Sequence, residues 1–541
     1  MELEGSATLV LAAGILCLAL LWEWKQQQQS RKFPPGPTPL PLLGNALQLS
    51  RGDLFTSLMA LRDQYGPVFT VLLGPRRVVV LCGYEAVKEA LVDHAEEFSG
   101  RGGMPSLDRI FHGYGVILAN GERWRQLRQF SVATLRSLGM GKRTLEERIA
   151  EEARCLVEEI RKTRGSPFNP SLPVSHAVAN VISSIAFGDR FDYQDPTFLS
   201  LLDVIQSLFL ELTSPWTRLY EMFPGIMRFL PGPHNRILKH VDVLHNFVTE
   251  RVQRNQKTLD PGCPRDYIDA FLIKMEEEKQ NPLSEFHTKN LVLSVVHLFF
   301  GGTEMVSSTL RYGFLLLMKY PEVQERVHQE IDGVIGRNRS PAAEDRSRMP
   351  YTHAVLHEIQ RFSNIIPLGI PHAVIRDTQF QGYMLPKCTE AKESSDFKPS
   401  PSRLASRFAQ AMPASHMLCG AALLTLAPGE KAKQGTDVFC MLGSALRDPR
   451  HFSDPERFNP GNFLDENGGF KKNHAFVAFS SGKRVCLGEG LARMELFLVF
   501  TSVLQHFTLQ SPVDPQEIDL APKASGFWNI PPEYRVCALP R

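Results

Sequence analysis

Residues 479–488 read Phe-Ser-Ser-Gly-Lys-Arg-Val-Cys-Leu-Gly and hold one cysteine, Cys486, between two glycines. Gly482 and Gly488 let the backbone turn tightly and approach a flat, bulky group. Arg484 precedes the cysteine by two residues, and cations and backbone N–H groups stabilise a thiolate, the form of cysteine that ligates soft metals. The alternative is an ordinary buried cysteine before a helix, which is the commoner situation for a lone cysteine.

The stretch matches the pattern Phe-x-x-Gly-x-Arg-x-Cys-x-Gly, which by chance arises in roughly one chain in several thousand of this length. It resembles the heme-binding loop of the cytochrome P-450 superfamily. The resemblance implies that the chain binds heme b, iron protoporphyrin IX, with Cys486 as the metal ligand through its thiolate. It also implies a heme-thiolate monooxygenase, most similar to mammalian microsomal family-two enzymes of the olfactory-type subfamily G.

Composition describes a globular chain with an ample core, since 43% of its 541 residues are hydrophobic and 22% are charged. The nine cysteines are scattered and form no C-x-x-C pair. This argues against a disulfide framework and a zinc site, and for a reducing, cytosol-facing environment. A mainly α fold with a small β-rich side, the cytochrome P-450 fold, is expected. Residues 68–72 and 78–81 are short β-rich runs that predict a small sheet.

Residues 1–24 are predicted to form a single transmembrane helix, because residues 7–22 are almost uninterruptedly apolar and two tryptophans suit the membrane interface. Basic residues after the run place the remaining chain in the cytosol, and the resemblance implies the endoplasmic reticulum membrane. A cleaved signal peptide is the alternative, but its basic residues would precede the apolar run. Residues 25–44 are a basic, proline-rich linker, and residues 45–541 form the catalytic domain.

Trp124 and Arg128 are four residues apart in a predicted helix and therefore share a face. This spacing alone is typical of a surface cation–π pair. In the superfamily the matching Trp-x-x-x-Arg hydrogen-bonds a heme propionate, for which a guanidinium is well suited. By the same resemblance, the cofactor-binding residues are Arg101, Trp124, Arg128, His372, Arg484 and Cys486.

Residues 291–319 form a long apolar run interrupted by Gly-Gly-Thr-Glu at 301–304. The glycines are expected to loosen the helix and open a groove for dioxygen. The run resembles the oxygen-activation helix of the superfamily, which implies catalytic roles for Thr303 and Glu304. Met305 occupies the position of the relay threonine, and its thioether cannot donate a proton. A membrane-anchored heme protein without useful turnover is therefore an alternative to the monooxygenase.

Glu358 and Arg361 are three residues apart in a predicted helix, an ordinary spacing for an ion pair. Together with Arg457 they match the Glu-Arg-Arg network of the superfamily, which implies a structural role on the heme side. The resemblance also implies an apolar aromatic cavity for small lipophilic substrates such as steroids, odorants or xenobiotics. The substrate positions would be Phe111, Ile117, Phe209, Phe300, Gly301, Glu304, Ile366, Ile370 and Phe527.

Partners also follow from the resemblance. Electrons would come from NADPH through a flavoprotein reductase that docks on the basic heme-side face, with cytochrome b5 as a second candidate partner. Arg125, Lys142, Arg143 and Lys483 are the candidate docking residues. A formal net charge of +2 makes no case for nucleic-acid binding.

Residues 388–434 depart from the family-two pattern and are predicted to be an atypical insertion in the catalytic domain. The segment is rich in Ser, Ala, Pro and Lys and resembles an unspliced intron or a misassembled exon. The flanking residues 386–387 and 435–436 are expected to form the tight turn between two paired strands of the main sheet. Long loops cost little entropy, but the apolar patch at 417–426 would be destabilising if exposed. A misspliced product that never folds is therefore a third interpretation.

Overall fold

The computed structural model describes residues 33–49, 53–140, 143–387 and 436–541. The predicted anchor at 1–24, the predicted insertion at 388–434 and Lys142 lie outside the described residues.

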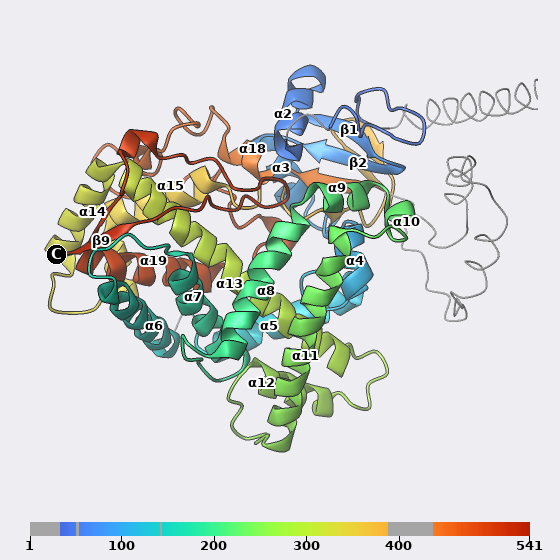
Figure 1. Cartoon of the computed structure of the whole chain (residues 1–541). Helices are drawn as coiled ribbons and strands as arrows, with labels where there is room; N and C mark the ends of the chain where they lie inside the picture. Colours follow the sequence, from blue (N-terminus) through green and yellow to red (C-terminus); the bar gives the residue numbers. More distant parts are fainter. Residues whose placement is uncertain (1–32, 50–52, 141–142, 388–435) are drawn as a thin grey trace, which may run out of the picture.

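Helices make up most of the described chain, and β1, β2, α2, α3 and α18 lie together at one end (Figure 1). The expectation of a mainly α fold with a small β-rich side is confirmed for the described chain. The longer helices are α2 (Leu54–Tyr65), α5 (Gly121–Ser137), α6 (Arg143–Lys162), α7 (Ser171–Ala186), α8 (Pro196–Leu212), α9 (Pro215–Met222), α11 (Arg236–Lys257), α12 (Tyr267–Glu277), α13 (Thr288–Lys319), α14 (Pro321–Val334), α15 (Pro350–Ser363) and α19 (Glu489–His506). The shorter ones are α3 (Tyr84–Lys88), α4 (Pro105–Phe111), α10 (Pro224–Met227) and α18 (Leu442–Leu446).

The main sheet has the strand order β1-β2-β7-β4-β3. β2 pairs with β1 antiparallel and with β7 parallel, and β4 pairs antiparallel with both β7 and β3. The predicted runs at 68–72 and 78–81 lie in β1 and β2, where β-branched residues pack into a fully or mostly buried face. The strands are β1 (Val68–Leu73), β2 (Arg76–Leu81), β3 (Gly100–Arg101), β4 (His372–Ala373), β5 (Thr378–Phe380), β6 (Tyr383–Leu385), β7 (Asp437–Cys440), β8 (Phe507–Gln510) and β9 (Cys537–Pro540).

The strands on either side of the predicted insertion do not pair with each other, so the expected tight turn between them is wrong. β6 pairs with β5 across a two-residue turn at Gln381 and Gly382, both at positive φ, as is favoured in short hairpins. β7 instead lies between β2 and β4 with all four residues buried. The partner of β6 is therefore set by a local turn, whereas β7 pairs with strands that are distant in the sequence.

α13 is the central helix of the fold and contacts α7, α11, α15 and α19. It is long and apolar enough to cross a membrane, but most of it is buried inside the protein, as in the core helix of a soluble domain. The helix runs without interruption through residues 301–304, so the expected loosening at its glycines is wrong. A Cβ at Gly302 would lie 2.9 Å from the side chain of Ile182, so this glycine permits close packing of α13 on α7.

The two ends of the chain that flank residues 388–435 lie side by side. The hydroxyl of Thr436 donates a hydrogen bond to the carbonyl oxygen of Pro386 at 3.0 Å. A chain without the intervening segment would therefore have only a short distance to bridge between Pro386 and Thr436.

Deleting residues 388–434 is expected to leave the fold intact and to raise its free energy of unfolding by about 2 kcal/mol, because each doubling of loop length costs about 0.6 kcal/mol in closure entropy. Thermal unfolding and far-UV circular dichroism of the full and shortened chains would measure this. A shortened chain that loses helical signal or melts earlier would show that the flanks need the segment.

Candidate functional site

Cys486 lies near the C-terminal end of the loop at 479–488, which precedes α19. Gly482 has a φ of 70°, and a Cβ there would collide with the carbonyl oxygen of Leu91, so only glycine fits. The N–H of Cys486 donates to the carbonyl oxygen of Phe479 at 3.0 Å, which closes the loop. Gly488 keeps an ordinary negative φ of −93° and has Cys486 Sγ as its nearest neighbour, at 3.9 Å from an added Cβ.

Cys486 is accessible at its surface although protein surrounds it. It is exposed by accessible surface, yet burial raises the pKa of its thiol. A thiol that is both accessible and surrounded by protein can be reached by a ligand. The backbone N–H groups of Gly488 and Glu489 and the guanidinium of Arg128 oppose the effect of burial on the pKa. These donors and this cation suit a thiolate that ligates a metal.

Three arginines surround the loop and donate to neutral oxygens. Arg101 donates to the carbonyl oxygens of residues 117, 370 and 371 at 3.1–3.4 Å. Arg128 donates to the carbonyl oxygen of Val485 at 2.7 Å. Arg484 donates to the carbonyl oxygens of Ser99 at 2.7 Å and residue 119 at 2.9 Å. Within the described part of the chain, no hydrogen bond or ion pair joins any of the three to a carboxylate.

The positive charges of these three arginines have no compensating anion among the described residues. Burial, followed by the charges of Arg101 and Arg128, lowers the pKa of Arg484 to about 7. Nη1 of Arg484 is buried without a hydrogen-bond partner among the described residues. Buried cations are costly unless they are paired, so the arrangement fits a ligand that carries negative charge.

Trp124 and His372 complete this part of the site. Arg484 lies over the Trp124 ring, with its guanidinium carbon 3.9 Å from the ring centre. The cation on Trp124 is therefore Arg484 and not Arg128, which the sequence spacing suggested. His372 pairs with Arg101 across β4 and β3, which places the two side chains together. Nδ1 of His372 lies 2.8 Å from the carbonyl oxygen of Phe98 and therefore donates to it. Burial, with Arg101 second, lowers the pKa of His372 to about 3.

The middle of α13 is less buried than the turns before and after it. Phe300, Gly301, Gly302 and Met305 are half-buried although the helix is buried on both sides of them along the chain. Gly301 and Met305 are one turn apart and so share a face, the open face of the helix. Thr303 is buried on another face, whereas Glu304, one turn after Phe300, is buried on the same side as that ring.

Thr303 and Glu304 differ in their hydrogen bonding. The hydroxyl of Thr303 is buried with no partner among the described residues. Glu304 accepts a hydrogen bond from the hydroxyl of Ser308 at 2.8 Å. Burial raises the pKa of Glu304, while the charge of Arg311 and the bond from Ser308 oppose this shift. Glu304 is therefore a carboxyl group suited to hold a proton.

Several of the predicted substrate positions lie beside α13, among them Phe111, Ile117 and Phe209. Phe209 on α8 stacks on Phe300 with ring centres 4.1 Å apart. Trp528, which the sequence did not single out, meets Phe209 edge to face at 5.4 Å. Ile117, Ile366 and Ile370 are half-buried against the core, whereas Phe111 and Phe527 are buried and contact His297 and Phe439.

His297 is a second buried polar residue that the sequence reasoning missed. It lies one turn before Gly301, and its Nδ1 accepts from the N–H of Ile117 at 3.3 Å. Its Nε2 has no partner among the described residues. The only sequence signal was a histidine inside an apolar run.

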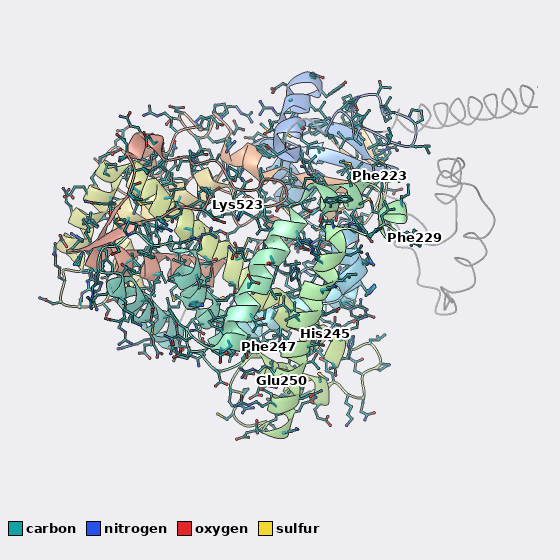
Figure 2. The ribbon with its side chains drawn as sticks, in the orientation of Figure 1. Phe223, Phe229, His245, Phe247, Glu250 and Lys523 are labelled. Carbon is teal, nitrogen blue, oxygen red and sulfur yellow. The ribbon has the colours of Figure 1, made fainter. Side chains whose placement is uncertain are left out.

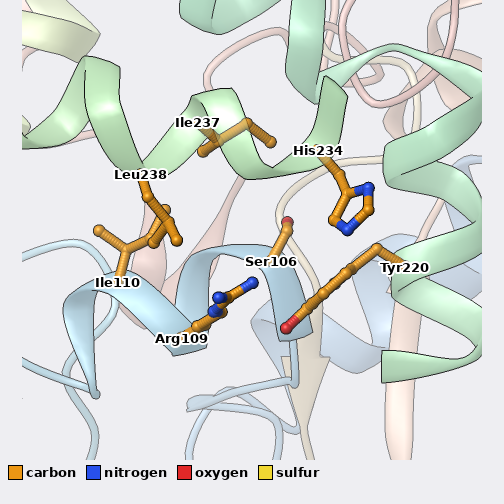
Figure 3. A pocket seen from close by; sticks show the side chains of 7 residues that line it. All are labelled: Ser106, Arg109, Ile110, Tyr220, His234, Ile237 and Leu238. Atoms are coloured by element: carbon orange, nitrogen blue, oxygen red, sulfur yellow. The ribbon is translucent and has the colours of Figure 1, made fainter. Parts of the chain in front are cut away.

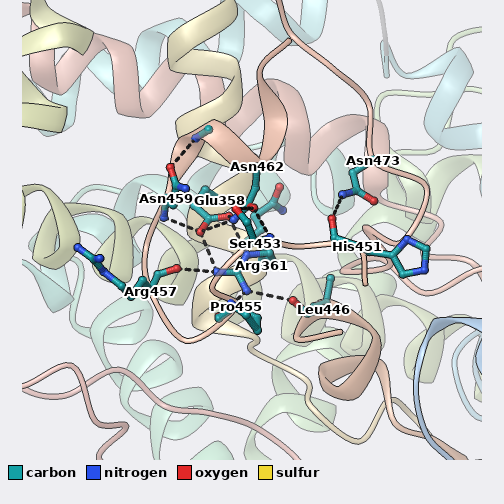
Figure 4. Close-up of polar contacts among 12 residues, drawn as sticks. Glu358, Arg361, Leu446, His451, Ser453, Pro455, Arg457, Asn459, Asn462 and Asn473 are labelled. Atoms are coloured by element: carbon teal, nitrogen blue, oxygen red, sulfur yellow. Dashed lines mark hydrogen bonds and ion pairs between the residues drawn. The ribbon is translucent and has the colours of Figure 1, made fainter. Parts of the chain in front are cut away.

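Glu358 and Arg361 form a fully buried pair with two bonds of 2.7 Å (Figure 4). Arg361 also donates to the carbonyl oxygen of Arg457 at 3.0 Å, and Glu358 accepts from the N–H of Asn459 at 2.7 Å. The Arg457 guanidinium itself is exposed and lies 3.7 Å from Asp454. The three residues meet as expected, but Arg457 contributes its backbone, because its side chain can remain hydrated at the surface.

Two hollows lie on the described chain, and the second of them borders Trp124 and Arg128 of the candidate site. One of about 10 Å³ between α4, α9 and α11 has room for about one water molecule (Figure 3). The other is a groove of about 700 Å³ beside α5. Two predicted docking residues, Arg125 and Lys483, line this groove, and Arg143 is exposed at the start of α6. The other charged residues that line it are Glu96, Arg128 and Arg136.

A family model described as Cytochrome P450 matches residues 34–391 and 425–538. Cytochrome P450 2G1 of Oryctolagus cuniculus is 54% identical over 541 residues, covering 100% of both chains. Cytochrome P450 2A13 of Homo sapiens is 51% identical over 538 residues, covering 99% of each. The family match omits residues 392–424, which lie within the predicted insertion.

Replacing His297 by Gln is expected to make the protein less sensitive to acid. Burial lowers the pKa of His297 to about 3 from 6.5, so the unfolded chain binds a proton that the folded chain refuses as the pH falls below about 6.5. Stability is then lost with falling pH, by about 1.4 kcal/mol between about pH 7.5 and 5.5. Glutamine can still accept from the Ile117 N–H but does not titrate.

Urea unfolding at both pH values would measure the difference between wild type and variant. The exposed His245 on α11 (Figure 2) offers the matched control, His245→Gln, which should leave the pH dependence unchanged. Equal pH dependence of the wild type and His297→Gln would contradict the prediction.

Proposed function

The chain belongs to the cytochrome P450 family and is a heme-binding monooxygenase, and on that premise we propose that Cys486 supplies the thiolate that ligates the iron of heme b. Arg101, Arg128, His372 and Arg484 bind the propionates in this proposal, and Trp124 packs beside them. The observation that carries it is a set of three arginines, without a carboxylate partner among the described residues, around the loop that holds an accessible cysteine.

Two propionates would supply the negative charge that the described residues lack. A planar guanidinium binds a carboxylate through two parallel hydrogen bonds, so three arginines can hold both groups in a fixed orientation. Nη1 of Arg484 is a free donor for this purpose.

Bound heme supplies the redox chemistry by which one atom of O2 enters the substrate. Cys486 contributes electron density through its sulfur, and the N–H groups that face it moderate that donation. Glu304 holds a proton near the open face of α13, and Thr303 adds a buried hydroxyl one residue before it.

Small lipophilic molecules such as steroids, odorants or xenobiotics are the proposed substrates. The stacked rings of Phe209 and Phe300 and the half-buried face at Gly301 and Met305 offer apolar contact with few polar groups. The further proposed substrate contacts are Phe111, Ile117, Glu304, Ile366, Ile370 and Phe527.

Electron supply from NADPH through a flavoprotein reductase, with cytochrome b5 as a second candidate partner, is proposed to use the groove beside α5. Besides Arg128, which is assigned to the propionates, the groove is lined by Arg125, Arg136 and Lys483, and its one carboxylate, Glu96, is paired with Lys483. An acidic partner surface would be attracted to such a groove, and the attraction would weaken with salt.

Attachment to the endoplasmic reticulum membrane through residues 1–24, with a cytosolic catalytic domain, is part of the proposal. Support comes from exposed apolar side chains on two neighbouring segments. Leu42 and Leu47 are 63% and 59% exposed, and Phe229, beyond α10, is 67% exposed (Figure 2). Grouped apolar exposure of this kind marks membrane or protein contact.

Residues 388–434 are proposed to be an insertion between the matched parts of the catalytic domain. The omission of residues 392–424 from the family match and the closeness of the two flanks support this.

Cys486→Ser is expected to abolish the thiolate-type Soret band of the reduced, carbon monoxide-bound protein, because a serine hydroxyl is not a thiolate donor. The measurement is the difference spectrum of membranes that contain equal amounts of each chain. Cys263→Ser, at an exposed cysteine, should keep the band. If the band persisted in the Cys486→Ser variant, Cys486 would not be the ligand of the iron.

Met305→Thr is expected to raise the product formed per NADPH severalfold and to lower peroxide release, because a hydroxyl is added on the open face of α13. Both quantities can be measured in one reconstituted assay. Val306→Thr adds the same hydroxyl at the next, buried position and should not improve coupling. Unchanged coupling in Met305→Thr would mean that proton delivery does not pass this position.

A further inference from the structure

Arg493 connects three segments around the Cys486 loop. On α19 its Nε and Nη2 each lie 2.9 Å from Oε1 of Glu489, the first residue of the helix. Its Nη1 lies 2.7 Å from Nε2 of His357 on α15. The guanidinium carbon is 5.1 Å from the centre of the Phe479 ring, at the beginning of the loop.

The hydrogen bond between Arg493 and His357 has a fixed direction. Arginine can only donate, so Nε2 of His357 accepts. Nδ1 of His357 lies 2.9 Å from the carbonyl oxygen of His353 and must carry the ring proton. The ring also packs within 4.8 Å of Phe470 and Phe476. His357 is therefore a rigid, oriented acceptor for Arg493.

Phe479 and Glu489, which Arg493 contacts on either side of the loop, also bond to Cys486. The carbonyl oxygen of Phe479 accepts from the N–H of Cys486 at 3.0 Å. The backbone N–H of Glu489, together with that of Gly488, points at the sulfur. Hydrogen bonds to a ligating sulfur withdraw electron density from it, and this tunes the reduction potential of the metal.

We infer that Arg493 is a positioning residue for the Cys486 thiolate, because it holds both ends of the loop against α15 so that backbone N–H groups face the sulfur. This inference depends on the proposed role of Cys486 as the heme ligand. The alternative is an ordinary helix-surface ion pair with Glu489, which contributes little to stability. A surface pair of that kind would not involve the buried His357 and would leave the sulfur unchanged.

Equilibrium redox titration of the heme-loaded protein with chemical mediators, without a reductase, tests the inference. Arg493→Gln should shift the potential to more negative values, because fewer N–H groups facing the sulfur leave more electron density on it. His357→Phe, which fits the aromatic surroundings but cannot accept, should shift it in the same direction. The double variant should shift no further than the larger single effect, since the two residues act as one network.

Arg161→Gln is the matched control, because Arg161 pairs with Glu158 on the exposed face of α6. The carbon monoxide difference spectrum of every sample separates the two levels of the argument. A thiolate band in wild type and Arg493→Gln, with equal potentials, would overturn the positioning role and leave the Cys486 assignment intact. A wild type that binds heme without that band would overturn both.

If the Arg493→Gln variant does not take up heme, the Arg493→Lys variant replaces it in the redox titration. Lysine keeps the charge but can reach Glu489 or His357, not both, since it lacks the planar fork of arginine. A negative shift in Arg493→Lys and in His357→Phe supports the inference, and unchanged potentials in both variants contradict it.

Discussion

Three guanidinium groups without carboxylate partners among the described residues are the constraint on which this structure depends. Burial, followed by the charges of Arg101 and Arg128, lowers the pKa of Arg484. Such an arrangement survives only if the surrounding fold is stable enough to hold it and a ligand compensates it. The hydrogen bonds to backbone carbonyl oxygens orient the three side chains without neutralising them, which leaves their charge available to an anionic ligand such as the proposed propionates.

Each of these arginines is placed by a different part of the fold. Arg101 is placed by strand pairing, since β3 pairs with β4 and β4 with β7. Arg128 is placed by its helical phase in α5, and Arg484 by the short turn before Cys486. α15 then joins these parts, because His357 and Glu358 are neighbours on one helix. His357 accepts a hydrogen bond from Arg493 on α19. Glu358 is buried with Arg361 against the loop at 455–462.

The helical phase of α13 arranges the residues beside the proposed substrate space. Gly301 and Met305 share the open face, whereas Thr303 is buried on another face. Glu304 lies one turn after the half-buried Phe300 and is buried, and it accepts a hydrogen bond from Ser308 at 2.8 Å. A change of side chain at 305 therefore alters the open face directly.

The sequence by itself determined the family resemblance and the mainly helical class, and it predicted Cys486 as the candidate heme ligand, because these depend on local motifs and on hydrophobic periodicity. Through the resemblance to the superfamily it also predicted Arg101, Arg128 and His372 as heme-binding residues. Only the tertiary structure decided that Arg484 lies over Trp124, that Arg457 contributes its carbonyl group, and that β7 pairs with β2 and β4. These facts are contacts between residues far apart in the chain. Helical phase predicts which residues share a face but not what lies opposite, so His297, Trp528 and Arg493 could be recognised only after the chain had folded.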